Sequence, residues 1–351
     1  MRKFIRRLGL SIAVVAASAV IFVPQVASAA TYIYRPSLVT NVNGVAFTPS
    51  GVYNSFSPNG LWLAGTSNGQ AAIYRLTTRT VILLGDVVGA DLGSSPYSEA
   101  VDVNDRGDVV GIRDVGSGRV RIREGWFLPA GATRVQSFGF YAWPNAMNNV
   151  GQVVGTDVAG AGAFLWDRAE GVKNYLPFTP TGHKWYTSAI NSAGLISGLT
   201  TEGESVVYDS AAEKFIDVPT TKPFSSAQDV NENGVVVGAQ YEDLGESTPG
   251  RAYTFDVPTR KFTRRPGLYH YTNLTISKTG IVVGTVIKTG QPVVINDCAG
   301  TPFTALGLST DAKLGGAVGA DAKGAIWGFY GDRLVEGYRT VRWLRTPACG
   351  T

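Results

Sequence analysis

Short runs of apolar and β-branched residues alternate with polar turns along most of this chain. Residues 187–218 show the pattern, with extended runs at 188–190, 195–198, 206–209 and 214–218. Such runs between Gly, Asn and Pro turns are typical of β-strands. Beyond the N-terminus, no segment sustains a helical apolar period over ten residues. The pattern predicts an all-β protein built from units of four short strands.

This unit occurs seven times. Each copy has a turn residue, two more residues, Gly, three residues and a second Gly, and the first copy has one extra residue between its glycines. Four-stranded units at a spacing of 40 to 47 residues are typical of β-propeller blades, which pack around a ring. We therefore predict a seven-bladed β-propeller with its core between the blades. The leading glycines of the seven copies are Gly60, Gly107, Gly151, Gly194, Gly234, Gly280 and Gly324.

The last unit lacks one strand. Its third strand is predicted at 340–344, and the chain ends soon afterwards, at residue 351. The segment 31–42 contains apolar and aromatic residues, precedes the first unit and has no other assigned place. We predict that it pairs as the outer strand of the last blade and so closes the ring. The alternative is a frayed N-terminal tail.

The repeat also resembles a known family. The phrase Asn-x-x-Gly-x-Val-Val-Gly followed by Ala-Phe-Leu-Trp resembles the HAF repeats of bacterial extracellular proteins. Residues 163–165 stand where that family has His-Ala-Phe, and Gly162 replaces the His. The order of turns and strands also resembles kelch blades, although the paired glycines of kelch are absent. The resemblance covers nearly all of residues 50–345 and implies a propeller, but it implies no particular reaction.

The N-terminus has the pattern of an export signal. Basic residues at 2–7 precede an apolar stretch at 8–23, and Ala27-Ser28-Ala29 matches a signal-peptidase site. We predict a signal peptide at 1–29 and a single propeller domain at 30–351, secreted, periplasmic or at the cell surface. An uncleaved membrane anchor is the alternative. No comparable apolar run follows, so we expect no membrane span after cleavage.

Charge argues against a nucleic-acid partner. Residues 1–30 hold four of the 31 basic residues and none of the 27 acidic ones, so the remaining chain has 27 of each. Nucleic-acid binding needs a surplus of Lys and Arg, and we therefore expect none. A local basic group, Arg119, Arg121 and Arg123, alternates along one strand and so shares a face. It is either an anion-binding ridge or a solvated edge strand.

Two cysteines are expected at the end of the ring. Cys298 and Cys349 each follow the third predicted strand of their units, and a disulfide fits an oxidising compartment. If the last two blades are neighbours, both thiols emerge at the same edge. We predict a disulfide between them, with two free buried thiols as the alternative.

Two segments in or beside the repeat phrase match known functional motifs in sequence but lack the structural context that these motifs need. Residues 229–234 match the opening of a calcium loop, but its twelfth position is Gln240, and another copy has Arg106 at a ligand position. Residues 65–69 fit the serine-hydrolase elbow, which needs a strand-to-helix turn that is not predicted here. Asx-type turns, in which the side-chain oxygen of the leading residue caps its own turn, explain all seven copies with one mechanism. We therefore expect no metal, no cofactor and no catalytic residue in the phrase.

The connections between units are rich in aromatic residues and contain both histidines of the chain beyond the leader. In a propeller these crossovers share one face around the central channel. Aromatic rings there suit a sugar or a peptide. The alternative is that they pack adjacent blades together. We expect Trp143, Trp185 and Tyr186 to be exposed, and the candidate ligand-binding residues are Tyr97, Tyr141, Trp143, His183, Trp185, Tyr186, Tyr269 and Tyr271.

The sequence therefore favours a secreted, monomeric binding protein without catalytic activity, with a glycan or an extracellular protein as its ligand. An alternative is an enzyme acting on an extracellular polysaccharide, either a glycosidase or a lyase. Such an enzyme needs two convergent carboxylates or an acid–base His. No spacing selects a pair among the acidic residues expected near the crossovers, which are Glu99, Asp102, Asp229, Glu242 and Asp243. A structural role at the cell surface is a third possibility.

Overall fold

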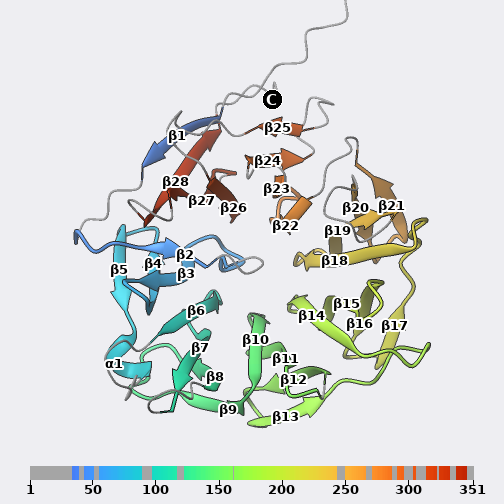
Figure 1. Ribbon diagram of the computed structural model, residues 1–351, viewed down its shortest axis with the longest axis horizontal. Coiled ribbons are helices and arrows are strands. Elements are labelled where there is room, and N and C mark those ends of the chain that lie inside the picture. Colours follow the sequence, from blue (N-terminus) through green and yellow to red (C-terminus); the bar gives the residue numbers. More distant parts are fainter. Residues whose placement is uncertain are drawn as a thin grey trace, which may run out of the picture.

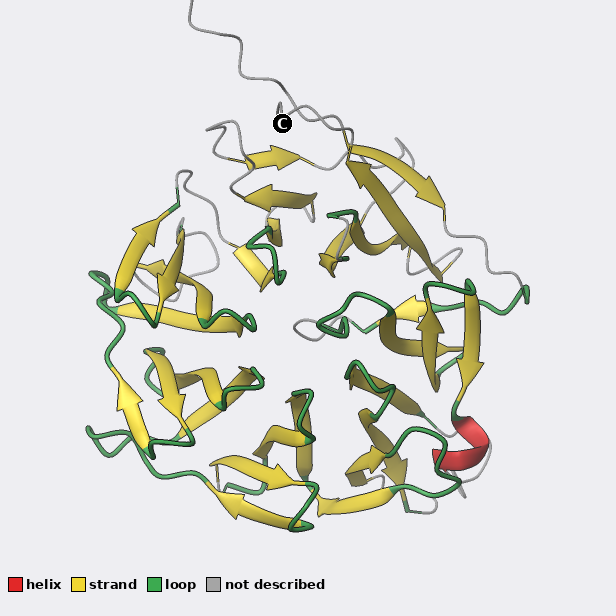
Figure 2. Cartoon of the chain, turned by 180° about the vertical axis from the view of Figure 1, so that it is seen from behind, coloured by secondary structure: helices red, strands yellow, loops and turns green. Residues whose placement is uncertain are grey.

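The fold is a ring of seven antiparallel sheets with almost no helix. In the described residues of the computed structural model, each sheet has four strands, and the single helix is α1 (Gly85–Val88). Figure 1 shows the blades around the centre of the ring, and Figure 2 shows the same ring from behind. This architecture confirms the predicted seven-bladed propeller. The structure describes residues 34–38, 43–50, 55–88, 97–116, 122–160, 162–242, 250–265, 271–286, 291–295, 303–305, 314–321, 324–332 and 337–345.

In blades 1 to 6 the strands follow one another in sequence from the centre of the ring to its rim. Blade 1 consists of β2 (Thr48–Pro49), β3 (Trp62–Ser67), β4 (Gln70–Arg75) and β5 (Thr80–Leu83). Blade 2 consists of β6 (Ser98–Val103), β7 (Val109–Val115), β8 (Ile122–Leu128) and β9 (Gln136–Phe140). Blade 3 consists of β10 (Ala142–Met147), β11 (Gln152–Asp157), β12 (Gly162–Asp167) and β13 (Val172–Tyr175).

The second half of the ring repeats this order. Blade 4 consists of β14 (Trp185–Ile190), β15 (Leu195–Thr200), β16 (Ser205–Asp209) and β17 (Lys214–Ile216). Blade 5 consists of β18 (Phe224–Val230), β19 (Val235–Tyr241), β20 (Arg251–Asp256) and β21 (Lys261–Arg264). Blade 6 consists of β22 (Tyr271–Ile276), β23 (Val282–Val286), β24 (Gln291–Ile295) and β25 (Phe303–Ala305). Blade 7 contains β26 (Leu314–Ala320), β27 (Ile326–Asp332) and β28 (Gly337–Arg345).

The outer strand of blade 7 comes from the other end of the chain. β1 (Tyr34–Leu38) pairs antiparallel with β28, placing Tyr34 opposite Arg345 and Leu38 opposite Val341. Figure 1 shows the blue β1 beside the red β28. This pairing confirms the prediction that the N-terminal segment closes the ring.

The core lies between the blades, as predicted. One cluster joins Ala64 and Ile73 of blade 1 to Val109 and Trp126 of blade 2, and Trp126 is fully buried. Each blade has buried apolar side chains on both faces, and it buries them against its two neighbouring blades.

The two glycines of each repeat phrase have different structural roles. Gly107 lies in the turn between the first two strands with φ +82°, a conformation that L side chains rarely adopt. Gly155 lies in β11 opposite a bulge in β10. A Cβ at Gly155 would lie 2.3 Å from the Trp143 carbonyl oxygen and 2.3 Å from the Phe164 ring. The first glycine permits the turn, and the second permits close packing against the innermost strand.

The turn asparagines form a hydrogen-bonded chain from blade to blade, here called the asparagine ladder. Each Asn Oδ1 accepts backbone N–H groups two and four residues ahead, as the capped-turn interpretation predicts. Each Nδ2 also donates to the carbonyl of the equivalent residue one blade on. These bonds run from Asn104 to Asn148 (3.4 Å), and from Asn148 to Asn191, Asn191 to Asn231 and Asn231 to Ser277 (3.0 Å each).

Asp108 adds an ionic link between blades 2 and 3. Its Oδ2 accepts hydrogen bonds from Arg106 Nε (3.0 Å) and from Arg168 Nη1 of blade 3 (2.9 Å), while Oδ1 accepts the Ala130 N–H. Burial alone would raise the pKa of Asp108. The hydrogen bonds from Ala130, Asn104 and Arg106 outweigh it, so the pKa lies below its ordinary value.

Candidate functional site

The crossover face is the end of the ring at which each outer strand connects to the innermost strand of the next blade. The loops between the second and third strands reach the same face, because successive antiparallel strands alternate in direction. The repeat turns lie at the opposite end of the ring. The two ends therefore carry different side chains.

A cleft of about 540 Å³ opens on the crossover face beside blade 4. Residues 179–181 from the crossover into blade 4, the end of β15 with the following loop, and residues 217–225 from the crossover into blade 5 line it. Its volume lies within the range of about 300–1,000 Å³ that is typical of small-ligand sites. Phe215 and Ile216 of β17 give it an apolar wall.

Polar groups line the cleft beside these and other apolar residues. Glu204 and Asp217 are both exposed, and Lys222 lies at the edge, paired with Glu242. The hydroxyl-bearing residues that line the cleft are Thr179, Thr181, Thr200, Ser205, Thr220 and Ser225. The lining thus offers hydroxyl donors and acceptors, carboxylate acceptors and an ammonium donor.

His183 borders this cleft. Its backbone N–H donates to Thr179 Oγ1 (3.0 Å), and its Nδ1 lies 3.7 Å from Glu204 Oε2. The side chain is 37% exposed. The structure therefore brings one sequence-predicted candidate to the cleft.

Trp185 is buried, so the expectation that it is exposed is wrong. It is 1% exposed, its Nε1 donates to the Pro177 carbonyl (2.9 Å), and its ring lies about 6 Å from the rings of Tyr208 and Phe215. Tyr186 is 41% exposed. Neighbouring residues of a strand point to opposite faces of the sheet, so one ring supports the blade while the next faces solvent.

Exposed aromatic side chains lie in and beside the crossovers into blades 3 and 4. Tyr141 ends the crossover into blade 3, Phe178 directly precedes the cleft residue Thr179, and Tyr186 lies in β14. Of these the sequence predicted Tyr141 and Tyr186 and missed Phe178. Among the described residues, the Phe, Tyr and Trp side chains more than 40% exposed are Phe140, Tyr141, Tyr175, Phe178 and Tyr186. All five lie within residues 140–186, and we call them the aromatic rim.

Trp143 and Tyr97 belong to a separate cluster. The Arg123 guanidinium lies 5.4 Å from the centre of the Trp143 ring and 5.6 Å from that of Tyr97. The Tyr97 hydroxyl donates to Glu99 Oε2 (2.6 Å), and Ser50 Oγ donates to Glu99 Oε1 (2.7 Å). Burial, strengthened by the neighbouring Glu99, raises the pKa of Tyr97. Trp143 is only half-buried, so part of this ring remains accessible.

Several sequence predictions fall outside the described residues. They are Tyr269, the Cys298–Cys349 disulfide, the signal peptide, and Arg119 and Arg121 of the basic group. Tyr271 is the first residue of β22. Asp243 also lies outside the described residues.

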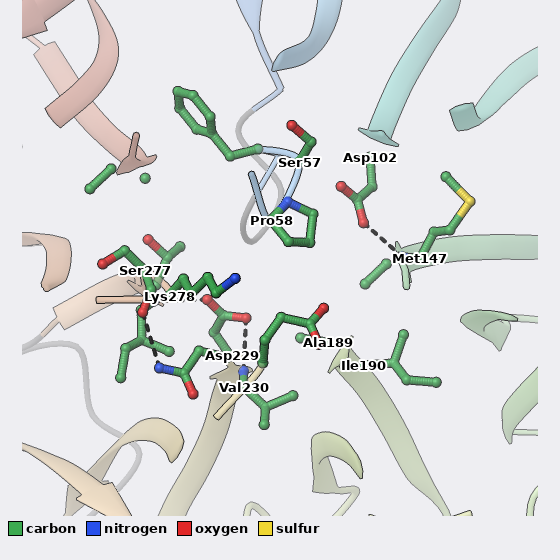
Figure 3. Close-up of a pocket in the computed structure, with 18 residues that line it drawn as sticks. Ser57, Pro58, Asp102, Met147, Ala189, Ile190, Asp229, Val230, Ser277 and Lys278 are labelled. Carbon is green, nitrogen blue, oxygen red and sulfur yellow. Dashed lines mark hydrogen bonds between the residues drawn. The ribbon is translucent and has the colours of Figure 1, made fainter. Parts of the chain in front are cut away.

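Asp102 and Asp229 lie at the opposite end of the ring from the predicted position near the crossovers. They come at the ends of β6 and β18, directly after a bulge in each strand. There they line a cavity of about 50 Å³, here called the channel-end cavity, to which all seven blades contribute (Figure 3). The two side chains are buried, with Asp102 5% and Asp229 1% exposed.

Each of these carboxylates bridges two blades. Asp102 accepts the N–H of Val103 and that of Met147 in blade 3 (2.7 Å each). Asp229 accepts those of Val230 and of Ile276 in blade 6 (2.8 Å each). Burial raises the pKa of Asp102 well above its ordinary value and that of Asp229 to about 7, against the opposing effect of these hydrogen bonds.

Comparison with known proteins supports the fold. No family model and no curated protein matches the sequence. Similar solved structures include streptogramin B lyase (12% identity, TM-score 0.61, covering 91% of this chain and 99% of that one). Oligogalacturonate lyase in complex with manganese (10%, 0.55, 90% and 97%) and the β-propeller domain of Myceliophteria thermophila Cps50 (Swd1; 13%, 0.59, 88% and 100%) are also similar. At this identity the likeness shows the propeller fold alone.

The described residues also bear on membrane insertion and metal binding. No helix there is long and apolar enough to span a bilayer. No group of three or more His, Cys, Asp and Glu side chains there is placed to hold a metal ion.

Proposed function

We propose that this protein is a non-catalytic binding protein that holds an extended glycan along the crossover face of blades 3 to 5. The observation that carries this proposal is the position of Phe178, an exposed ring next in sequence to the cleft. Rings of this kind pack against the C–H faces of sugars with little loss of side-chain entropy. Hydroxyls and carboxylates in the cleft would exchange hydrogen bonds with sugar hydroxyls.

A sugar fits the cleft better than an apolar ligand does. Six hydroxyl-bearing residues, two carboxylates and one ammonium line it beside apolar residues that include Phe215, Ile216 and Val218. Tyr141 and Tyr175 belong to the crossover into blade 3 and to β13, so exposed rings are present beyond blade 4, which would suit a chain of several sugar units. A protein ligand remains the alternative on the same face.

Catalysis is supported less well. Glu204 and Asp217 are the carboxylates of the cleft, and both are exposed to solvent. A glycosidase holds its acid in a desolvated environment that keeps it protonated. Two of the similar structures are lyases, but their 10–12% identity to this chain carries no reaction across.

We also propose that the protein acts outside the cytoplasm. The N-terminal signal-peptide pattern and the resemblance to the HAF repeats of bacterial extracellular proteins both support this location. Mass spectrometry of the mature N-terminus in cell fractions tests it, and a full-length chain retained in the cytoplasm would refute it.

A glycan array probed with the purified protein tests the binding proposal. Binding is expected to fall at least tenfold in the Phe178→Ala/Tyr186→Ala double variant. Leu83→Ala is the matched control, because Leu83 is 52% exposed on the rim of blade 1, away from the cleft. Equal glycan binding by both variants would refute the site, and binding to peptides but not to glycans would refute the ligand class.

A further inference from the structure

The channel-end cavity holds two buried carboxylates, Asp102 and Asp229. In the described part of the chain, no ion pair reaches Asp102 or Asp229. Each carboxylate accepts two backbone N–H groups, and such bonds favour its ionised form. Ionising both carboxylates in one cavity is costly unless a cation balances them, so a bound cation would stabilise their charged forms.

A third oxygen at the same level of the ring lacks a partner. Thr275 lies two residues before the turn residue Ser277, as Asp102 lies before Asn104 and Asp229 before Asn231. All three residues follow a bulge in the innermost strand and line the cavity. Thr275 is 2% exposed, and its hydroxyl makes no hydrogen bond. A buried hydroxyl without a partner is costly, and a ligand in the cavity would satisfy it.

We propose that the channel-end cavity binds one hard divalent cation, with Asp102, Asp229 and Thr275 supplying oxygen ligands. Blades 2, 5 and 6 contribute these three residues, so the ion would tie together parts of the ring that share no sheet. A cavity of about 50 Å³ has room for an ion and a few waters, since one water needs about 10–15 Å³.

Calcium fits this set of ligands better than magnesium. Ca²⁺ accepts six to eight oxygen ligands in flexible geometry and uses hydroxyls, carbonyls and waters beside carboxylates. Mg²⁺ requires near-octahedral geometry at shorter distances, and strands fixed in a ring cannot easily close around it. The positively charged side chain of Lys278 is exposed and also lines the cavity. It therefore competes with the ion.

Calorimetric titration of the purified, chelator-treated protein with CaCl₂ and with MgCl₂ tests the site. We expect one Ca²⁺ per chain, weaker Mg²⁺ binding, and a melting temperature raised by about 5 °C at a hundredfold excess of Ca²⁺ over Kd. Thr275→Val removes one ligand at nearly constant volume and is expected to weaken Ca²⁺ binding about tenfold. Lys278→Met removes the competing charge and is expected to strengthen it.

Thr285→Val is the matched control. Thr285 is also buried, and its hydroxyl also lacks a partner, but it lies in β23 and does not line the cavity. The proposal is overturned if Ca²⁺ neither binds nor raises the melting temperature, or if Thr275→Val and Thr285→Val bind it equally. It is also overturned if Asp229→Asn, once shown to be folded by its circular dichroism, retains full affinity. The glycan array reads out the opposite face, so the two proposals fail independently.

Discussion

Replacing Asn191 by Ser or by Ala separates the two contributions of the asparagine ladder to stability, which are the capped turn and the link between blades. The Asn191 Oδ1 accepts the N–H groups of Ala193 (3.1 Å) and Leu195 (3.0 Å), which holds the turn. Its Nδ2 donates to the Asn231 carbonyl (3.0 Å), which links blade 4 to blade 5. Serine keeps an acceptor for the turn but cannot reach the next blade, whereas alanine removes both contributions.

The natural repeats support this division. Ser277 stands in the equivalent position of blade 6, and its Oγ accepts the Ile281 N–H (3.0 Å). Ser57 of blade 1 likewise accepts from Leu61 and Trp62. A serine turn is therefore compatible with the fold.

The expected losses follow from the number of buried hydrogen bonds. Asn191 is 2% exposed, and each buried bond contributes about 1 kcal/mol net. Asn191→Ala loses three bonds and is expected to lower the free energy of unfolding by about 3 kcal/mol. Asn191→Ser keeps the bond to the Leu195 N–H, as Ser277 does with Ile281, but loses the bond to Ala193 and the link between blades, so it is expected to cost about 2 kcal/mol.

Urea unfolding monitored by tryptophan fluorescence measures these losses. Asn174→Ala, at an exposed position of β13, serves as the control and is expected to change stability by less than about 0.5 kcal/mol. If Ser and Ala at position 191 destabilise equally, the acceptor contributes nothing to the turn. If neither variant differs from the control, the ladder does not stabilise the ring.

Three further predictions concern packing, pH and closure. Gly155→Ala places a Cβ 2.3 Å from the Trp143 carbonyl and the Phe164 ring, so a loss of about 1–3 kcal/mol is expected in thermal unfolding; an unchanged melting temperature would contradict it. The folded-state pKa of Asp108 lies below its unfolded value. Its stabilising contribution is therefore complete at neutral pH and lost as the pH falls below about 4, and Asp108→Asn is expected to flatten the acid-unfolding curve over that range. Deleting residues 34–38 leaves an edge of β28 unpaired, and light scattering is expected to show aggregation that the intact chain lacks.

The repeat spacing predicted the architecture well because its turn chemistry is local. A Gly with positive φ and an Asn that caps its own turn act within a few residues, and the same local signals occur in successive blades. The missing fourth strand of the last blade then indicated where residues 34–38 pair.

The orientation of individual side chains depends on features that the spacing does not show. The sequence placed Trp185 and Tyr186 together on an exposed surface, yet alternation along β14 buries one and exposes the other. Asp102 was expected near the crossovers. It lies two residues before the turn residue Asn104, at the end of β6 away from the crossovers, and there it lines the channel-end cavity directly after the bulge between Ala100 and Asp102. Phe178 was missed because a single ring in a crossover carries no periodic signal.

The shared last blade also has a consequence for how the protein is made. The Thr340 hydroxyl donates to the Phe47 carbonyl across 293 residues, close to where β1 joins β28. Neither contact can form until β28 has been synthesised, so blade 7 closes the ring after the strands of blades 1 to 6 have been made. Contacts of such long sequence range form slowly. A chain interrupted before β28 would therefore leave β1 without its partner strand and the ring open.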